Sequence, residues 1–397
     1  MAQAPERDWA IDAVRGLALL GILVANLSFF TMPGGVAGEW GRQAYPDWVD
    51  RAASFVIRAG FENSFILIFS FLFGYGAARQ LATGTPARFR RRLIGLAIIG
   101  ILHALLFWAG DILLAYALIG LIVPLAARWP THRIYSAALL LWCVAILGNT
   151  LVGVGLIMLH PPSPDPAAAI ALYNGGDFSE IFAARLLEWA EFYGFGLLVL
   201  MPLVAAAFLL GLAAERWLAG RPPSALAQLA PDILRFLLWP AILGSIAYGV
   251  LASAPHRWAQ DALLVPEIIL RALFSPMLAA LILAWALQAF TSHVRAPVLG
   301  MFRINGRLSL SIYVGQSIVC VLLFQGFGAR LYGAIGPARS LLVALVIFGA
   351  MTAIAAAWLR VFGQGPLERL LDIFIARRER YASSWQGDRS PEGSGKP

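Results

Sequence analysis

The sequence predicts an all-α membrane protein, a polytopic bundle of about ten transmembrane helices with both termini in the cytoplasm. Of its 397 residues, 60% are hydrophobic and only 13% are charged, whereas about a quarter of the residues of a soluble protein are charged. The mean hydropathy is +0.75. Apolar runs of about 20 residues, the length that crosses a bilayer as a helix, recur along the chain. A soluble core does not need so much apolar sequence, whereas a bilayer does.

The expected transmembrane helices follow from the apolar runs, taken in chain order. They lie near residues 9–31, 62–80, 92–109, 111–128, 135–159, 191–214, 232–253, 267–289, 304–326 and 340–362. Only Gly110 separates the third run from the fourth, which predicts a tight helical hairpin. The runs make one transmembrane domain over residues 1–382. The tail at 383–397 is rich in Ser, Gly and Pro and is expected to be disordered and cytoplasmic.

The distribution of arginine predicts which loops face the cytoplasm, because cytoplasmic loops carry an excess of positive residues. The loops after every second run and the C-terminal segment hold most of the arginines: Arg79, Arg88, Arg90, Arg91, Arg92, Arg128, Arg133, Arg216, Arg221, Arg295, Arg303, Arg369, Arg377, Arg378 and Arg380. Both ends of the chain therefore face the cytoplasm. The net charge of +8 comes almost wholly from arginine, and because the arginines are scattered between apolar runs, no nucleic acid is expected as a partner.

One long external loop is expected at residues 160–190. Its first part holds four prolines between residues 161 and 166, which exclude a helix there. Asp177, with Glu180 three residues later, matches the N-cap and the N3 acid of a helix. A short amphipathic helix over 178–190 is therefore expected on the outer surface, leading into the sixth span.

Three polar residues interrupt the first apolar run. Asp12 and Arg15 are three residues apart, so they share a helix face and can neutralise each other. Arg15 and Asn26 are eleven apart, which also brings both onto one face, ~16 Å apart along the axis. Two interpretations stay open: Asp12 and Arg15 anchor the helix at the interface, or Arg15 and Asn26 point into one polar column.

A histidine and two carboxylates lie at similar depth in the outer half of the membrane. His103 is inside the third run, Asp111 follows at the next turn, and Glu62 opens the second run. With Asn26 they are expected to converge in one outward-facing polar pocket. Histidine paired with a carboxylate is the usual general base, although a lone buried histidine is more often a helix-packing residue. No metal or haem is expected, because no two histidines have the spacing of such a site.

The ninth run carries a polar stripe on one helix face. Its members are Ser309, Tyr313, Gln316 and Ser317, and Arg307 precedes them. Such a stripe either holds helices together by hydrogen bonds or forms the wall of a polar cavity.

Several segments resemble the YeiB-like family of bacterial inner-membrane proteins, a family of unknown function. The first is the run from Asp12 through Arg15 and Gly16 to Asn26, which looks like the opening motif of that family. The other matching segments, in order, are 69–76, 91–103, 110–116, 306–317 and 365–368. The resemblance extends from about residue 8 to 378.

The YeiB-like family is grouped by resemblance with the transmembrane acyltransferases, which include heparan-α-glucosaminide N-acetyltransferase and the acyltransferase-3 enzymes. The resemblance implies an inner-membrane acyltransferase that moves an acyl group, expected to be acetyl, from cytoplasmic acyl-CoA to an extracytoplasmic sugar or glycan. Asn26 stands where the acyltransferase-3 pattern has its histidine, so His103 is left as the intramembrane histidine for the chemistry. Asp111 or Glu62 is expected to orient it. The residues expected to bind the substrate or acyl-CoA are Arg15, Asn26, Arg307, Tyr313, Gln316 and Ser317.

Two alternatives remain open. One is a transporter or exporter of a small amphiphilic solute that uses the same polar column. The other is a non-catalytic membrane partner of another protein. The lipid bilayer is a partner in every case, and a homo-oligomer is compatible with the sequence.

Overall fold

The computed structural model describes residues 9–35, 38–159, 165–253, 263–292 and 297–387, and within these ranges it consists of helices and their connections, with no strand. The all-α fold class is confirmed. In chain order the elements are α1 (Trp9–Thr31), α2 (Glu39–Ala44), α3 (Trp48–Val56), the π-helix η2 (Ile57–Phe61), α4 (Ser64–Thr83), α5 (Pro86–Leu106), α6 (Leu113–Gly120), α7 (Val123–Ala126), α8 (Thr131–Leu159), α9 (Pro166–Gly175), α10 (Phe178–Val199), α11 (Met201–Trp217), the 3-10 helix η3 (Pro223–Leu229), α12 (Ala230–Ala252), α13 (Leu264–Ser292), α14 (Pro297–Arg307), α15 (Ser309–Phe324), α16 (Pro337–Phe362) and α17 (Pro366–Gly387).

The apolar runs all form helices, but not every one of these helices is long and apolar enough to cross a membrane by itself. Across the described ranges, 6 helices are long and apolar enough to cross a membrane, or up to 8 if each of two bent pairs is one span. The bent pairs are α10 with α11, at 65°, and α14 with α15, at 94°. The other two runs form α5, which begins with an arginine-rich segment, and the short α6 and α7. The chain is therefore a membrane helix bundle.

The helix α10 begins as predicted but ends later. An Asp177 carboxylate oxygen accepts the Glu180 N–H at 2.9 Å, and a Glu180 carboxylate oxygen accepts the Asp177 N–H at 2.9 Å. This capping box satisfies two backbone donors at the start of the helix. The predicted end near residue 190 is wrong, because no residue breaks the backbone before Pro202, and α10 runs to Val199.

Two further expectations at helix ends are corrected. The proline-rich start of the external loop is helical from Pro166 onward, since Asp165 caps α9 by accepting the N–H of Ala167 at 2.9 Å. Proline fits the first turn because an N–H has no intrahelical partner there. The helix α17 continues to Gly387, so the first residues of the predicted tail are helical. The expected disorder farther on and residues 160–164 lie outside the described ranges.

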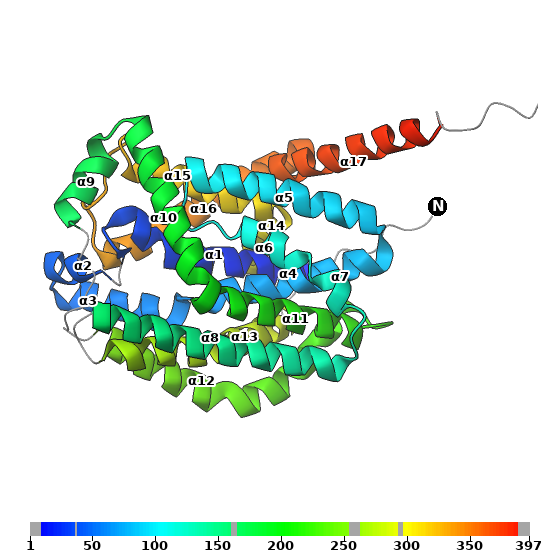
Figure 1. The fold of residues 1–397 in the computed structure, drawn as a ribbon, viewed down its shortest axis with the longest axis horizontal. Coiled ribbons are helices and arrows are strands. Elements are labelled where there is room, and N and C mark those ends of the chain that lie inside the picture. The colour runs from blue at the N-terminus through cyan, green and yellow to red at the C-terminus, as the bar shows by residue number, and fades with distance from the viewer. Residues whose placement is uncertain (1–8, 36–37, 160–164, 254–262, 293–296, 388–397) are drawn as a thin grey trace, which may run out of the picture.

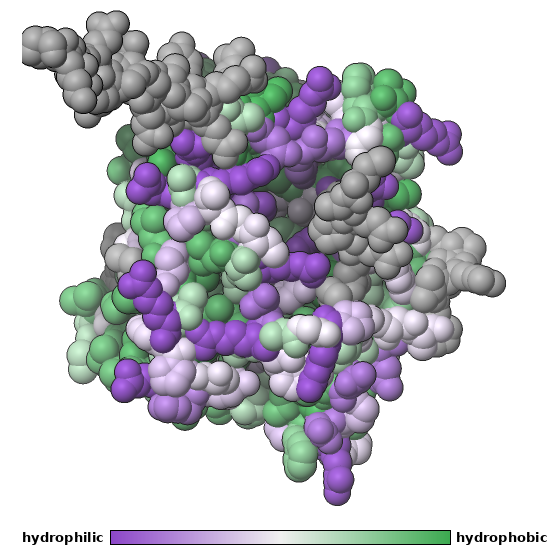
Figure 2. All heavy atoms as spheres, turned by 90° about the vertical axis from the view of Figure 1, so that its right-hand side faces the viewer, coloured by the Kyte–Doolittle hydropathy of each residue, from purple (hydrophilic) through white to green (hydrophobic). Residues whose placement is uncertain are grey.

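The segments predicted to lie on opposite sides of the membrane are found at opposite ends of the bundle. Helices α2, α3 and α9 lie at one end, whereas the far end of α17 lies at the other (Figure 1). The first group belongs to the segments predicted outside, and the second to those predicted inside. Figure 2 faces the second end and shows hydrophilic side chains spread across it. Arg295, one of the arginines behind the prediction, lies outside the described ranges.

Helix α1 is the centre of the bundle and packs against α4, α13, α14, α15 and α16. Glycines allow the closest approaches between helices. A methyl group at Gly16 would stand 1.9 Å from the Phe302 carbonyl oxygen of α14, and one at Gly74 would stand 2.3 Å from the Phe208 carbonyl oxygen of α11. Small residues at crossings are the usual way in which membrane helices pack closely. These glycines therefore bring α1 to α14 and α4 to α11.

Candidate functional site

The turn between α5 and α6 brings a histidine and an aspartate into contact. Nδ1 of His103 lies 2.8 Å from Oδ1 of Asp111, and the two side chains are 1% and 0% exposed. The other carboxylate oxygen of Asp111 accepts the backbone N–H of Leu114 at 3.0 Å. Because the carboxylate accepts the Nδ1 proton, Nε2 of His103 keeps a lone pair that can take up a proton.

Nε2 of His103 is buried and makes no hydrogen bond to any residue that the structure describes. Its surroundings are aromatic, since the ring centroids of Tyr313 and Phe107 lie 5.0 Å and 6.3 Å from that of the imidazole. A buried acceptor without a partner costs about 1–3 kcal/mol. The pair has the form of an oriented general base.

Gly100 makes the approach of α5 to the aspartate possible. A methyl group at this position would stand 2.7 Å from Oδ2 of Asp111 and 2.6 Å from the backbone nitrogen of Leu114. On α6, the hydroxyl of Tyr116 is hydrogen-bonded to that of Ser70 in α4 at 2.9 Å. The matching segments 91–103 and 110–116 therefore build the frame that holds the dyad.

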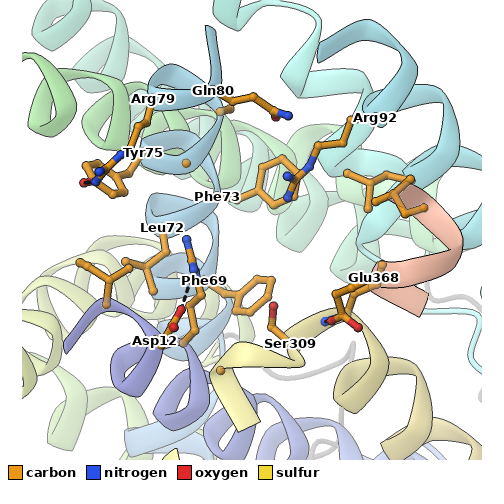
Figure 3. Close-up of a pocket in the computed structure, with 18 of the residues that line it drawn as sticks. Asp12, Phe69, Leu72, Phe73, Tyr75, Arg79, Gln80, Arg92, Ser309 and Glu368 are labelled. Carbon is orange, nitrogen blue, oxygen red and sulfur yellow. Dashed lines mark hydrogen bonds and ion pairs between the residues drawn. The ribbon is translucent and has the colours of Figure 1, made fainter. Parts of the chain in front are cut away.

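A cavity of about 630 Å³, here called the vestibule, lies at the end of the bundle where α1 and α5 begin. Its charged lining has an excess of arginine over acid: Arg15, Arg79, Arg92 and Arg307 against Asp12, Glu368 and Asp372. Figure 3 shows Arg79, Gln80 and Arg92 on one side of the cavity and Asp12, Ser309 and Glu368 on the other. The net positive lining favours an anionic ligand.

The contacts of these arginines leave their flat guanidinium groups at the cavity wall. Arg15 pairs with Asp12 at 3.0 Å, as predicted, while its own side chain remains 27% exposed. Arg79 donates to the hydroxyl of Tyr75 at 3.0 Å, and Arg307 donates to the Gly363 carbonyl at 3.4 Å. Arginine binds phosphate and carboxylate through paired N–H donors. The vestibule is therefore suited to a phosphate-bearing ligand.

The bend between α14 and α15 is held by a residue from the start of α17. Oε1 of Glu368 accepts the backbone N–H of Leu310 at 2.8 Å and that of Ser311 at 3.2 Å. The hydroxyl of Ser311 donates to the same carboxylate and accepts the N–H of Leu367 at 3.0 Å. Helix N-termini have unsatisfied N–H groups that a carboxylate stabilises. The matching segments 306–317 and 365–368 thus form one structural unit beside the vestibule.

A second cavity, of about 10 Å³, lies farther along α1 and α15 and is here called the outer cavity. It brings together four residues predicted to bind substrate: Asn26, Tyr313, Gln316 and Ser317. Its volume is close to that of one water-sized probe. Of the predicted column on α1, Arg15 lines the vestibule and Asn26 lines the outer cavity.

Glu62 does not lie beside His103 and Asp111, so the expected convergence of Glu62 with His103 in one pocket is wrong. Its carboxylate accepts the hydroxyl of Tyr248 in α12, and it lies 3.5 Å from Nε of Arg58 and 3.6 Å from a terminal nitrogen of Arg271. The π-helix η2 packs against α12, and its Arg58 pairs with Glu267 of α13. Glu62 therefore belongs to a separate buried ionic cluster.

Sequence reasoning missed the other members of that cluster. Arg58 is 3% exposed and donates to Glu267 and to the carbonyl of Ala252. The signal was available, because Arg58 with Glu62 and Glu267 with Arg271 are both pairs four residues apart at the ends of apolar runs. Two charge pairs of this kind predict that their helices meet.

Arg185 was missed as well, although it lies close to the dyad along α5. It is 2% exposed, and it donates to the carbonyl of Leu106 and to the side chain of Gln325. These bonds fix α10 against the end of α5 that carries His103. A single arginine in an amphipathic segment gives no sequence signal for such a contact.

These features define a class: a polytopic α-helical membrane protein with a buried histidine–aspartate dyad and an arginine-lined vestibule.

Residues 224–374 match the family model described as "Protein of unknown function (DUF418)". The chain is 29% identical over 388 residues to "Uncharacterized protein YxaH" of Bacillus subtilis (strain 168), covering 92% of this chain and 93% of the relative. It is 28% identical over 389 residues to "Uncharacterized protein YeiB" of Escherichia coli (strain K12), covering 92% and 95%. No solved structure matches it. The predicted resemblance is confirmed: the DUF418 match and the two full-length relatives, one of them YeiB, support a place for this chain beside the YeiB-like proteins.

Proposed function

We propose that this protein is an acyltransferase of the bacterial inner membrane. It moves an acyl group, expected to be acetyl, from cytoplasmic acyl-CoA to an extracytoplasmic sugar or glycan. The observation that carries the proposal is the buried pair of His103 and Asp111, in which Nδ1 is bonded to the carboxylate and Nε2 is left without a described partner. An oriented imidazole with a free lone pair is what acyl transfer to a hydroxyl or amine requires.

In the proposed reaction, Nε2 of His103 takes the proton of the acceptor hydroxyl or amine while the acceptor atom attacks the thioester carbonyl carbon. The carbon–sulfur bond then breaks, the acyl group stays on the acceptor, and the thiolate of CoA takes the proton from His103. The charge of Asp111 stabilises the imidazolium that forms between these events. An acyl-histidine route uses the same nitrogen as the nucleophile and passes the acyl group on in a second step.

The vestibule supports acyl-CoA as the donor. CoA is polyanionic, and the four arginines of the vestibule outnumber its three acids. The volume of about 630 Å³ lies within the range of about 300–1,000 Å³ typical of small-molecule sites. Tyr313 lines the vestibule and its ring lies beside that of His103, so a single side chain lies between this part of the cavity wall and the imidazole.

The test is release of CoA from acetyl-CoA by the purified protein in nanodiscs, followed with a thiol-reactive dye. His103→Ala is expected to lower the rate about 10²–10⁴-fold, the usual contribution of general acid–base catalysis. The matched control is His132→Ala, since His132 is exposed at the start of α8 and its loss should leave the rate unchanged. Equal turnover by the His103 variant, with an unchanged melting temperature, would refute the assignment.

A transporter of a small amphiphilic solute is the second candidate, and the bent helix pairs favour it. Interrupted helices near the membrane centre are typical of transporter binding sites, and α14 meets α15 at 94° beside the vestibule. The same preparation distinguishes the two functions. Transport is supported if acetyl-CoA neither binds nor is cleaved while a fluorescent anionic amphiphile crosses proteoliposomes only when the protein is present.

A further inference from the structure

Tyr313 separates the two cavities of the polar column. In the part of the chain that the structure describes, it is the one residue shared by the linings of the vestibule and the outer cavity. Its side chain is 5% exposed and borders both cavities. On one side of it lie the arginines of the vestibule, and on the other lie Asn26, Gln316 and Ser317.

The same side chain also covers His103. The rings of Tyr313 and His103 have centroids 5.0 Å apart and planes inclined at 49°. His103 lines neither the vestibule nor the outer cavity, and its Nε2 is buried. A molecule in the vestibule therefore reaches neither His103 nor Asn26 while the Tyr313 ring keeps this position.

The surroundings of Tyr313 allow the ring to move. The vestibule offers about 630 Å³ of space on one side of the ring. The residue lies near the start of α15, just after the 94° bend that separates this helix from α14. Rotation of this buried side chain toward the vestibule exchanges the interaction of its hydroxyl with the Ile112 backbone for space in the cavity.

We infer that Tyr313 is the gate of this molecule. The described conformation is the closed one, and rotation of the ring connects the vestibule to the outer cavity and uncovers His103. The inference does not rest on acyl transfer, because a transported solute would have to pass the same ring. In either case the ligand that opens the gate is an anion held by the vestibule arginines with an apolar or acyl end directed at Tyr313.

A native cysteine reports whether the two cavities are connected. Cys320 lines the outer cavity and is 0% exposed, while Cys143 is exposed on α8 and is replaced by serine to remove its signal. The probe is an anionic methanethiosulfonate that does not cross membranes, applied to sealed inside-out vesicles. It reaches Cys320 from the vestibule only when the gate is open.

Tyr313→Ala is expected to raise the labelling rate of Cys320 at least about tenfold. A minor open state of at most about 10% becomes permanent when the ring is removed. Tyr313→Phe keeps the ring but loses the interaction of the hydroxyl with the Ile112 backbone, so its labelling rate is expected to lie between those of the parent protein and Tyr313→Ala. Phe73→Ala is the matched control, because Phe73 also lines the vestibule with an aromatic ring but does not border the outer cavity.

Equal labelling of the parent and of Tyr313→Ala overturns the inference, as does an equal increase with Phe73→Ala. Where Tyr313→Ala does not give a cooperative melting transition, Tyr313→Leu replaces it, with the same expected increase. Because labelling of Cys320 does not depend on turnover, this experiment tests the gate even if the protein does not cleave acetyl-CoA. If Tyr313→Ala labels Cys320 as slowly as the parent protein and still cleaves acetyl-CoA normally, the gate is contradicted and the proposed acyl transfer is not.

Discussion

Gly306 in α14 lies so close to Asp12 in α1 that a methyl group at position 306 would stand 1.7 Å from the Asp12 carbonyl oxygen. The two helices cross through the backbone at this point. Asp12 pairs with Arg15, and Arg307 follows Gly306, so the crossing sets the positions of two arginines of the vestibule. The YeiB-like motifs at residues 12–26 and 306–317 therefore meet in one contact.

The crossing predicts a large effect of a small substitution. Gly306→Ala should destabilise the protein by about 1–3 kcal/mol, the usual cost of overpacking, because backbone cannot move aside as a side chain does. The measurement is the thermal melting temperature in detergent. Gly300→Ala is the control on the same helix, since a methyl group there meets nothing within 4 Å. A melting temperature of Gly306→Ala equal to that of the control would contradict the described crossing.

The carboxylate of Asp111 is predicted to act through His103. Asp111→Asn keeps the size of the side chain but removes the charge and permits the other imidazole tautomer, so CoA release should fall about 10²–10⁴-fold. The assay is release of CoA from acetyl-CoA. Asp165→Asn is the control, because Asp165 is exposed and caps α9. Acyl transfer through the dyad is contradicted if the two variants have the same rate.

The arginines of the vestibule are predicted to bind the donor and not to take part in the chemical step. Arg92→Gln should raise the KM for acetyl-CoA about 10–100-fold with little change in kcat, since a charged hydrogen bond contributes about 1.5–3 kcal/mol. The exposed Arg133 at the start of α8 provides the control as Arg133→Gln. A drop in kcat with constant KM would instead place Arg92 in the reaction itself.

The cap of α10 predicts a dependence of stability on pH. Hydrogen bonds from the Ser179 hydroxyl and the Glu180 N–H lower the pKa of Asp177 below its ordinary value. The stabilisation is therefore present above the unfolded pKa of about 3.9 and is lost as the pH falls through the lower folded pKa. Melting temperatures between about pH 3 and 5 should decline more for the parent protein than for Asp177→Asn, which caps the helix without titrating. Parallel curves for the two proteins would exclude this contribution.

The sequence determined the features that depend on neighbours along the chain. The helical runs, the capping box of α10 and the pair of Asp12 with Arg15 all involve residues within a few positions of one another. The contact of His103 with Asp111 belongs to the same kind, because a tight hairpin leaves these two residues little freedom. Periodicity and spacing suffice for such contacts.

Only the tertiary structure decided which helices meet. Glu62 pairs with Arg271 and not with His103, and Glu368 caps a helix that begins 59 residues earlier at Ser309. Tyr313 lines both cavities. The physical reason is the solvent: lipid is as apolar as the protein core, so apolar periodicity does not distinguish a buried face from a lipid-facing one. Phe236 and Trp239 of α12 are 68% and 65% exposed, yet in sequence they read like core residues. The site was predicted from the polar residues within the apolar runs, and the packing of the helices decided which of these residues share a cavity.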